Sequence, residues 1–307
     1  SAASDVYKRQ LLITVDGADQ ISYDRHKPRN SVPDTLDAQI VTDAARFLQE
    51  GEKMQLQYAV QNTSRSIGTR ISSHIVTKFG MRNSLQPDHL TIKLQGSAGQ
   101  ALGAFAAPGL KLEVAGEAND YVGKGLSGGT IVVRPAQISP LVASENTIIG
   151  NTVLYGATAG YLFAAGRAGE RFAVRNSGAK TVVEGCGSNG CEYMTGGISV
   201  VLGSIGANFG AGMTGGMAYL YDPKGSAAPM MNMETLVTCS VTAPHWEKEL
   251  KDLVIRHANE TGSLKAADIL QHWDQERHNF IQVCPKEMLV HLPAPLSDAQ
   301  AQSIPAE

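Results

Sequence analysis

Long apolar runs, an excess of charge and a secretory signal are all missing from this 307-residue sequence. No stretch of about 18 apolar residues occurs, so we predict no membrane-spanning helix. The formal net charge is −3, which favours neither a nucleic-acid partner nor a disordered acidic chain. The first residues lack the charged stretch and apolar block of a secretory signal, and we therefore expect a cytoplasmic protein.

Cysteine is also scarce. Four cysteines in a chain of this length suit a reducing compartment. Cys186 and Cys191 are separated by four residues, but no second pair or neighbouring histidine completes the four ligands of a structural zinc site. We therefore interpret them as two small residues in a packed turn and not as metal ligands.

Recognisable catalytic sets are absent as well. The sequence has no G-x-S-x-G elbow, no assignable Ser-His-Asp order and no H-E-x-x-H motif, so we predict no catalytic, cofactor-binding or metal-binding residue. Structural roles are favoured for the histidines within the predicted helices and near the C-terminus, which are His74, His245, His257, His272 and His278.

Neighbouring carboxylates leave two interpretations. The pairs are Glu117 with Asp120, and Glu184 with Glu192. Such pairs can work as acid and base in sugar chemistry. We favour the alternative in which a carboxylate at a corner pairs with arginine, such as Glu170 with Arg171 or Arg175.

Glycine, in contrast, is abundant and concentrated. Of 32 glycines, 26 lie between Gly96 and Gly216, where charge is sparse. Short β-branched or aromatic runs separate them, and equivalent glycines recur at intervals of 18 to 20 residues, with one inserted stretch at 135–146. A period near 20 with short strands is typical of a single-stranded solenoid, and we predict a parallel β-helix of about seven rungs over residues 89–222.

The stretch ANDYVGKGLSGG at 118–129 contains the G-x-G-x-x-G spacing of a dinucleotide-binding turn. Such a turn must open a helix, but the next residues, GTIVVRP, predict a strand. We therefore assign the glycines to corners of the solenoid, where positive φ or close backbone approach is needed. The predicted corner glycines are Gly96, Gly99, Gly103, Gly123, Gly125, Gly128, Gly129, Gly196, Gly197, Gly203, Gly206, Gly210, Gly215 and Gly216.

Asparagines also gather near these corners. They are Asn119, Asn151, Asn176, Asn189 and Asn208. Asparagine can form amide ladders between rungs or occupy left-handed turns, and the sequence leaves both interpretations open.

The segments that flank the glycine-rich window differ from it. Residues 11–88 predict an α/β flank in which residues 34–50 and 66–80 are helical and residues 52–62 form a half-buried strand. The chain does not begin with Met, and we expect residues 1–10 to be a foreign or truncated leader of a fragment.

The last segment, 223–307, predicts a helical cap and a frayed tail. One helix has Pro244 in its first turn and Gly262 as its stop, and Ser263 caps a second. We expect these helices to dock on the end of the solenoid and cover its open edge.

Several of these stretches resemble the C-terminal, glycine-rich (GXGXG) domain of the glutamate synthase large subunit. The resemblance extends from residue 62 to 222 and is carried above all by ANDYVGKGLSGG at 118–129 and AGERFAVRNSGA at 168–179. Residues 1–10 depart from the family. The resemblance implies a right-handed β-helix without catalytic residues, which joins and spaces the catalytic parts of the enzyme.

For the full enzyme the resemblance implies three further features. An amidotransferase domain releases ammonia from glutamine. A barrel domain with FMN and an iron–sulfur cluster adds it reductively to 2-oxoglutarate, giving two glutamates, and a reductase small subunit is a possible further partner. None of the family's nucleophile, FMN or cluster positions lies in this chain, and Cys186 and Cys191 do not match the cluster ligands.

Two alternatives remain at this point. One is a scaffold subunit that resembles the glycine-rich β-helix of formylmethanofuran dehydrogenase. The other is a stand-alone β-helix enzyme that acts on carbohydrate or acyl donors.

Overall fold

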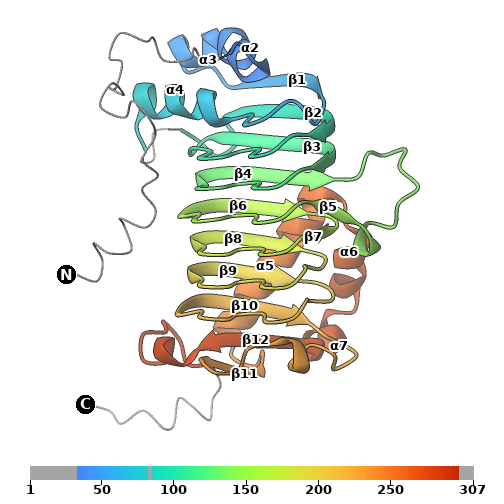
Figure 1. Ribbon diagram of the computed structural model, residues 1–307. Coiled ribbons are helices and arrows are strands. Elements are labelled where there is room, and N and C mark those ends of the chain that lie inside the picture. Colours follow the sequence, from blue (N-terminus) through green and yellow to red (C-terminus); the bar gives the residue numbers. More distant parts are fainter. Residues whose placement is uncertain (1–32, 82–84, 297–307) are drawn as a thin grey trace, which may run out of the picture. The chain divides into compact units, whose positions relative to one another are not determined.

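The structure is a computed structural model that describes residues 33–81 and 85–296. The chain divides into two compact units, residues 1–34 and 35–307. Almost all of the first unit lies outside the described residues, as do the predicted leader at 1–10 and the last eleven residues of the predicted tail. The helices and strands labelled in Figure 1 all belong to the second unit.

A twelve-stranded mixed sheet forms the centre of this unit (Figure 1). Eight successive neighbours along it are parallel. They are β1 (Met54–Val60), β2 (Leu90–Ala98), β3 (Leu110–Ala118), β4 (Ser127–Arg134), β6 (Ala159–Ala164), β8 (Ser177–Val183), β9 (Thr195–Val201) and β10 (Gly215–Tyr221). Two antiparallel strands, β12 (Phe280–Pro285) and β11 (Leu236–Ser240), follow β10, and the sheet does not close on itself. The expectation of a mostly β protein is confirmed.

The parallel strands repeat with a nearly constant interval. From β2 onward, paired positions are 18 to 20 residues apart in sequence, as for Leu90 with Leu110 and Lys180 with Ile198. Two steps are longer: Met54 on β1 pairs with Leu90 on β2, 36 residues later, and Thr130 on β4 pairs with Tyr161 on β6, 31 residues later. The extra residues between β4 and β6 contain the expected insertion at 135–146 and lead into β5 (Thr147–Ile149), which pairs with β7 (Arg167–Ala168) beside the main row of strands.

Between strands the chain passes through a five-residue segment of unusual geometry. In each of six repeats the first, third and fifth residues of this segment have positive φ. The segments are 101–105, 121–125, 152–156, 171–175, 189–193 and 208–212. Positive φ is therefore not confined to glycine, since twelve of these eighteen positions carry another residue.

These segments are also hydrogen-bonded to one another. The third residue donates its N–H to the preceding segment, as in Gly123 to the Leu102 carbonyl (2.8 Å) and Leu154 to the Val122 carbonyl (2.8 Å). The first residue donates toward the following repeat, as in Tyr121 to the Asn151 carbonyl (2.8 Å). The segments thus satisfy buried backbone groups away from the main sheet.

Two apolar cores lie on the two faces of the parallel strands. Leu112, Ile131 and Leu162 point to one face and belong to a core enclosed by the repeats. Val132 and Phe163, one position later in each strand, point to the other face and belong to a second core with helix α5 (Pro244–Thr261). This is the alternation expected of strands buried on both faces.

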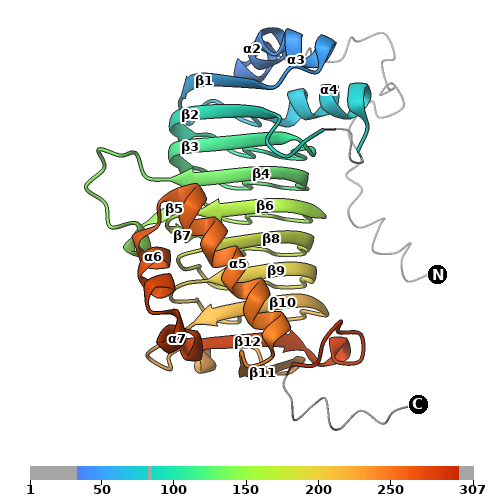
Figure 2. The same ribbon diagram turned by 180° about the vertical axis from the view of Figure 1, so that it is seen from behind.

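Helix α5 runs across the outer face of the strands (Figure 2). It contacts β4, β6 and β8, and its apolar residues Trp246, Leu250 and Leu253 join the second core. The expectation that the C-terminal helices dock on the end of the stack is wrong. From β4 onward both faces of the strands are largely apolar, with Lys180 on β8 lying 2.7 Å from Glu249 of α5, so the outer face needs a cover.

The C-terminal segment is also less helical than predicted. Three 3₁₀ turns and two short helices accompany α5, but β12 and β11 occupy the position next to β10 at the end of the sheet. The remaining elements are α6 (Leu264–Gln271), α7 (Trp273–Glu276), η3 (Ala228–Met230), η4 (Arg277–Asn279) and η5 (Lys286–Met288), with η2 (Ala143–Glu145) in the insertion.

The N-terminal elements follow the sequence closely. The first predicted helix is divided at Ala44 into α2 (Leu36–Asp43) and α3 (Ala45–Glu50), and Gly51 ends it in a left-handed conformation. The second is α4 (Thr69–Phe79), with Gly80 beyond its end. Among the described residues no helix is both long and apolar enough to cross a membrane.

Candidate functional site: the sheet face covered by helix α5

The glycine-rich stretch at 118–129 opens a strand. β4 begins at Ser127, so no helix N-terminus faces Gly123 or Gly125. A Cβ atom on Gly125 would lie 2.5 Å from the ring of Phe105, which already covers that position. This arrangement lacks the strand–turn–helix of a dinucleotide site.

The predicted corner glycines fall into two groups. Positive φ is found at Gly96, Gly103, Gly123, Gly125, Gly128, Gly197, Gly210 and Gly216. At the others a Cβ atom would lie 3.0 Å or less from a neighbouring atom: Gly99, Gly129, Gly196, Gly203, Gly206 and Gly215.

Cys186 and Cys191 lie in the core enclosed by the repeats, and both are free thiols. Burial raises the pKa of both, that of Cys191 to about 12. The thiolate form is therefore disfavoured at neutral pH. Within residues 33–81 and 85–296 no cluster of three or more His, Cys, Asp or Glu side chains is arranged to hold a metal ion.

The polar residues at the corners bind locally. A corner carboxylate does pair with an arginine, but the pair is Glu192 with Arg171 (3.4 Å), and among the described residues Glu170 forms no ion pair with Arg171 or Arg175. The Glu117 carboxylate accepts a hydrogen bond from Ser97 (2.8 Å), and that of Asp120 accepts one from the Asn151 N–H (2.7 Å). These contacts join neighbouring repeats.

The asparagines show both of the interpretations that the sequence left open. Amide pairs form where Asn119 donates to Asn62 (2.8 Å) and where Asn232 donates to Asn208 (3.0 Å). Asn189 and Asn208 have positive φ. The Asn176 side chain is buried and accepts from the Ala179 N–H (2.9 Å), and the Asn151 side chain accepts from the Glu170 N–H (2.8 Å).

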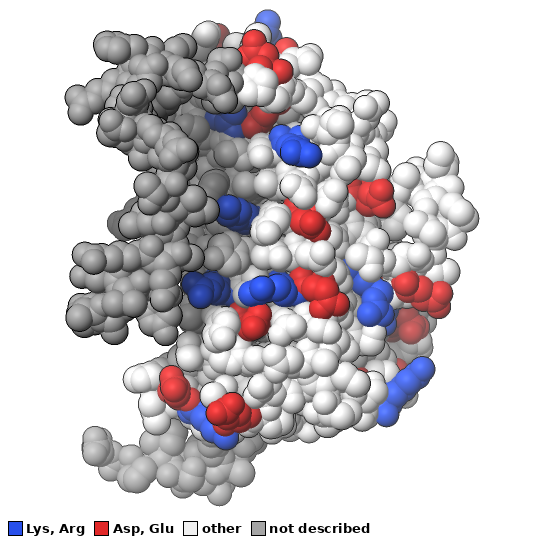
Figure 3. All heavy atoms as spheres, in the orientation of Figure 1, with Lys and Arg blue, Asp and Glu red and all other residues white. Residues whose placement is uncertain are grey.

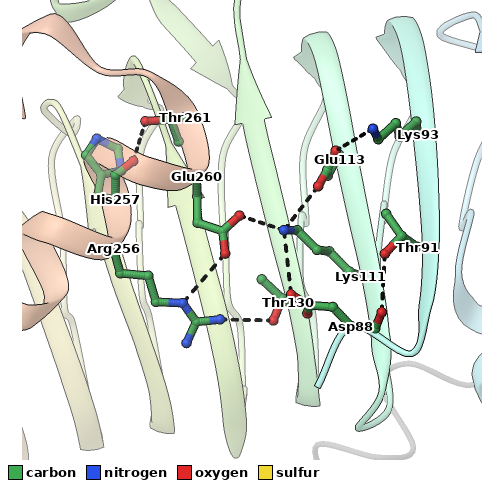
Figure 4. Close-up of polar contacts among 10 residues, drawn as sticks. All are labelled: Asp88, Thr91, Lys93, Lys111, Glu113, Thr130, Arg256, His257, Glu260 and Thr261. Carbon is green, nitrogen blue, oxygen red and sulfur yellow. Dashed lines mark hydrogen bonds and ion pairs between the residues drawn. The ribbon is translucent and has the colours of Figure 1, made fainter. Parts of the chain in front are cut away.

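An ion-pair network fastens the C-terminal turn of α5 to the sheet (Figure 4). Lys111 on β3 donates to Glu260 on α5 (2.6 Å) and lies 3.0 Å from Glu113 and 3.6 Å from Asp88. Burial alone would lower the pKa of Lys111, but the hydrogen bonds to Glu260 and Glu113 outweigh it and raise that pKa. A carboxylate in the last turn of a helix opposes the helix dipole, so Lys111 stabilises Glu260 where it would otherwise be unfavourable.

Arg256, one turn earlier on α5, makes a second contact with the sheet, which combines ring stacking with polar interactions. Its guanidinium lies 3.8 Å above the Tyr161 ring and 5.2 Å from that of Phe163. It also lies 3.5 Å from the Thr130 hydroxyl and 3.7 Å from Glu260. Stacking on a ring shielded from water contributes more than an exposed ion pair, and this contact fixes α5 over β4 and β6.

A buried polar cluster joins the turn between α5 and α6 to the end of β8. The Ser263 hydroxyl donates to Glu184 and accepts from the Ala266 N–H (3.0 Å), so that it caps α6. The imidazole of His257 is fully buried, with Nε2 3.7 Å from Glu184. Burial lowers the pKa of His257 more than the Glu184 carboxylate raises it.

This cluster contains Ser, His and Glu but is not arranged for nucleophilic catalysis. The serine proton is directed to the carboxylate, and neither ring nitrogen of His257 has a hydrogen-bond partner within the part of the chain that the structure describes. A nucleophile needs its base within about 3.2 Å. The cluster therefore fixes the position of α6. Sequence reasoning missed both contact sets, because Lys111, Glu184, Arg256 and Glu260 carry no local motif.

The charged residues on the visible surface are mixed in sign. Figure 3 shows lysines and arginines interspersed with aspartates and glutamates over the strands, with no continuous basic stripe on that face. A stripe of one sign would be expected of a face that tracks a nucleic-acid backbone.

Comparisons with known proteins agree with the repeated, glycine-rich fold described above. The model of the GXGXG family, described as the GXGXG motif, matches residues 37–286. The motif has glycines two positions apart, and the positive-φ residues in each five-residue segment have the same spacing.

Curated relatives match over most of the chain. The glutamate synthase [NADPH] large chain of Azospirillum brasilense is 61% identical over 93% of this chain and 19% of its own length. The ferredoxin-dependent glutamate synthase 2 of a Synechocystis species is 46% identical over 85% of this chain and 17% of its own length. The glutamate synthase [NADH] of Schizosaccharomyces pombe is 44% identical over 87% of this chain and 13% of its own length. The chain thus spans less than a fifth of the length of these relatives.

Proposed function

Because this chain belongs to the GXGXG family, we propose that it is a structural, interdomain-spacing domain of a glutamate synthase large chain. In the longer polypeptide it would be joined to amidotransferase and FMN-barrel domains that form glutamate from glutamine and 2-oxoglutarate. The observation that carries the proposal is the 61% identity over 93% of this chain, which falls within one fifth of a glutamate synthase.

A spacing role is supported by the way the repeats are bonded. Every parallel strand from β2 to β10 in the main row is paired on both sides, and the five-residue segments add further hydrogen bonds between repeats. A stack in which each repeat is held by its neighbours resists bending and can keep two attached domains at a fixed separation. Helix α5 supports the same role, since it crosses several strands and ties them together.

We further propose that residues 89–222 form a right-handed parallel β-helix. Seven of the parallel strands, β2, β3, β4, β6, β8, β9 and β10, fall in that range and follow one another along the sheet. Connections between parallel strands of one sheet are right-handed in about 98% of cases, which supports the handedness. An experimentally determined structure with left-handed connections would contradict this part.

We also propose that this domain does not determine which electron donor the enzyme uses. Relatives named for NADPH, NADH and ferredoxin all share it at 44% identity or more. We also propose that the chain itself holds no FMN, iron–sulfur cluster or substrate. Titration of the 307-residue chain with FMN, NADPH or glutamine should give no saturable binding. A dissociation constant in the micromolar range for any of them would contradict the proposal.

The spacing role can be tested in the full-length polypeptide with Val133→Asp, which places a charge in the enclosed core. The expected result is glutamine hydrolysis that continues without matching glutamate formation. Circular dichroism must first show that the repeats are disrupted. Unchanged coupling of the two reactions in such a disrupted variant would refute the spacing role. The matched control is Thr195→Asp, at an exposed position of β9, which should leave the coupling intact.

A further inference from the structure

One repeat carries an insertion that the stack itself does not need. The step from Thr130 to Tyr161 is 31 residues, against 18 to 20 in the other steps from β2 to β10. The added segment, 135–146, projects beyond the row of strands as the loop between β4 and β5 in Figure 1. Glu145 is its only charged residue.

This loop, which we call the insertion loop, exposes large aliphatic side chains. Ile138 is 95% exposed, Leu141 55% and Val142 56%. Scattered surface aliphatics are ordinary, but three within five residues of an almost uncharged loop are typical of a surface that becomes covered. An isolated loop gains nothing by exposing them, because the hydrophobic effect favours their removal from water.

A hollow of about 540 Å³ lies beside the loop. Ile138 and Leu141 of the insertion loop line it, together with Gly96 and Gly116 in the last part of β2 and β3. Arg134 and Glu117 are the charged residues on its wall.

We propose that the insertion loop and this hollow form the surface against which another domain of the same longer polypeptide packs, with an apolar, uncharged segment seated in the hollow. The proposal rests on the proposed function. Relatives of this chain are five or more times as long as the part matched, so most of such a polypeptide lies outside the 307 residues and must be placed against them. The near absence of charge on the loop fits an apolar segment better than a charged ligand.

The contact can be tested by cross-linking within the full-length polypeptide. A photo-crosslinking amino acid would replace Ile138, and in a matched control it would replace Leu264, which is 87% exposed on α6. The expected result is intramolecular cross-links from position 138, identified by mass spectrometry, to residues outside this chain, at least tenfold more abundant than from position 264. Equal yields at the two positions would overturn the proposal, and so would cross-links from position 138 only to a second copy.

A second measurement tests the same contact without the photo-crosslinking amino acid. The variant Ile138→Ser, Leu141→Ser, Val142→Ser should leave the thermal unfolding of the 307-residue chain unchanged, because these side chains are exposed. In the full-length polypeptide it should speed hydrogen exchange at 135–146 about tenfold, and Leu264→Ser should not. Unchanged exchange in the triple variant would refute the contact.

A different measurement tests the proposed function, so its failure can be distinguished from failure of the docking proposal. A full-length polypeptide that forms no glutamate from glutamine and 2-oxoglutarate fails the proposed function, whereas cross-links and exchange rates do not require activity.

Discussion

Lys111 on β3 and Glu260 in the last turn of α5 are 149 positions apart in the sequence, yet their charged groups lie 2.6 Å apart. This contact lies where the side chains on the outer face of the strands change from charged to mainly apolar. From β4 onward that face is largely apolar, and α5 contacts β4, β6 and β8 there, whereas on β2 and β3 it carries Lys93, Lys111 and Glu113. The ion pair therefore joins the last turn of α5 to the charged part of this face.

The first prediction concerns this pair. Lys111→Met and Glu260→Gln should each destabilise the fold, and a double-mutant cycle should give a coupling energy of about 1 kcal/mol, since both side chains are largely shielded. Urea denaturation measures it. Lys93 with Glu113, at 4.0 Å and more exposed, is the control and should show no measurable coupling. A Lys111–Glu260 coupling as small as the control would contradict the role of the pair.

The same pair predicts a pH effect. The pKa of Lys111 is raised in the folded state above its usual value of 10.5. Its stabilisation is therefore complete below pH 10.5 and is lost as the pH rises through the folded pKa. Above pH 10.5 the wild type should lose stability more steeply than Lys111→Met, and parallel curves would contradict the assignment.

A second prediction compares two glycines of similar φ. Gly197 (φ +82°) has a backbone oxygen of Ala179 only 2.3 Å from the position of a Cβ, whereas Gly156 (φ +62°) has nothing within 4 Å. Gly156→Ala should cost about 1 kcal/mol from backbone strain alone. Gly197→Ala should lower the free energy of unfolding at least twice as much, because the new Cβ would also clash with the backbone oxygen of Ala179, which cannot move aside. Equal midpoints of chemical denaturation in the two variants would show that the repeats are less tightly stacked than described.

A third prediction concerns the positive-φ residues that are not glycine. Thr152 has φ +57°, and a β-branched residue is strained there. Thr152→Gly should therefore stabilise the protein by about 1 kcal/mol, which raises the melting temperature by roughly 2 °C in a chain of this size. Thr147→Gly, at a strand position without positive φ, should lower it. A lower melting temperature in Thr152→Gly would indicate that the threonine contributes more than its strain removes.

A fourth prediction concerns His257. Burial lowers its pKa below the usual 6.5, so the folded state binds fewer protons than the unfolded state just below that pH. The contribution of the neutral, buried His257 to the free energy of unfolding should therefore be complete above pH 6.5 and decrease as the pH falls below that value. His257→Gln should remove part of that fall below pH 6.5, as measured by denaturation midpoints. The same slope in wild type and His257→Gln would assign the pH dependence to other groups.

Much of the fold could be predicted because its signals are local. The 18 to 20 residue interval, the strand after Gly125 and the ends of α4 and α5 at Gly80 and Gly262 follow from glycine placement and apolar periodicity. The double-sided burial of β4 and later strands was also present, in runs such as TIVV and ISVV, and it could have predicted a helix over their outer face.

The sequence by itself determined the repeat, its strands and the helices beside it, because each depends on residues that are near one another along the chain. Only the tertiary structure decided where α5 lies, that β12 and β11 continue the sheet, and that Lys111 meets Glu260 and Ser263 meets Glu184. Those contacts join residues 79 and 149 positions apart, and no local pattern records which distant side chain will satisfy a buried charge. Alternating positive φ at residues such as Tyr121 and Arg175 is likewise imposed by hydrogen bonds from neighbouring repeats, which outweigh the preference of each residue.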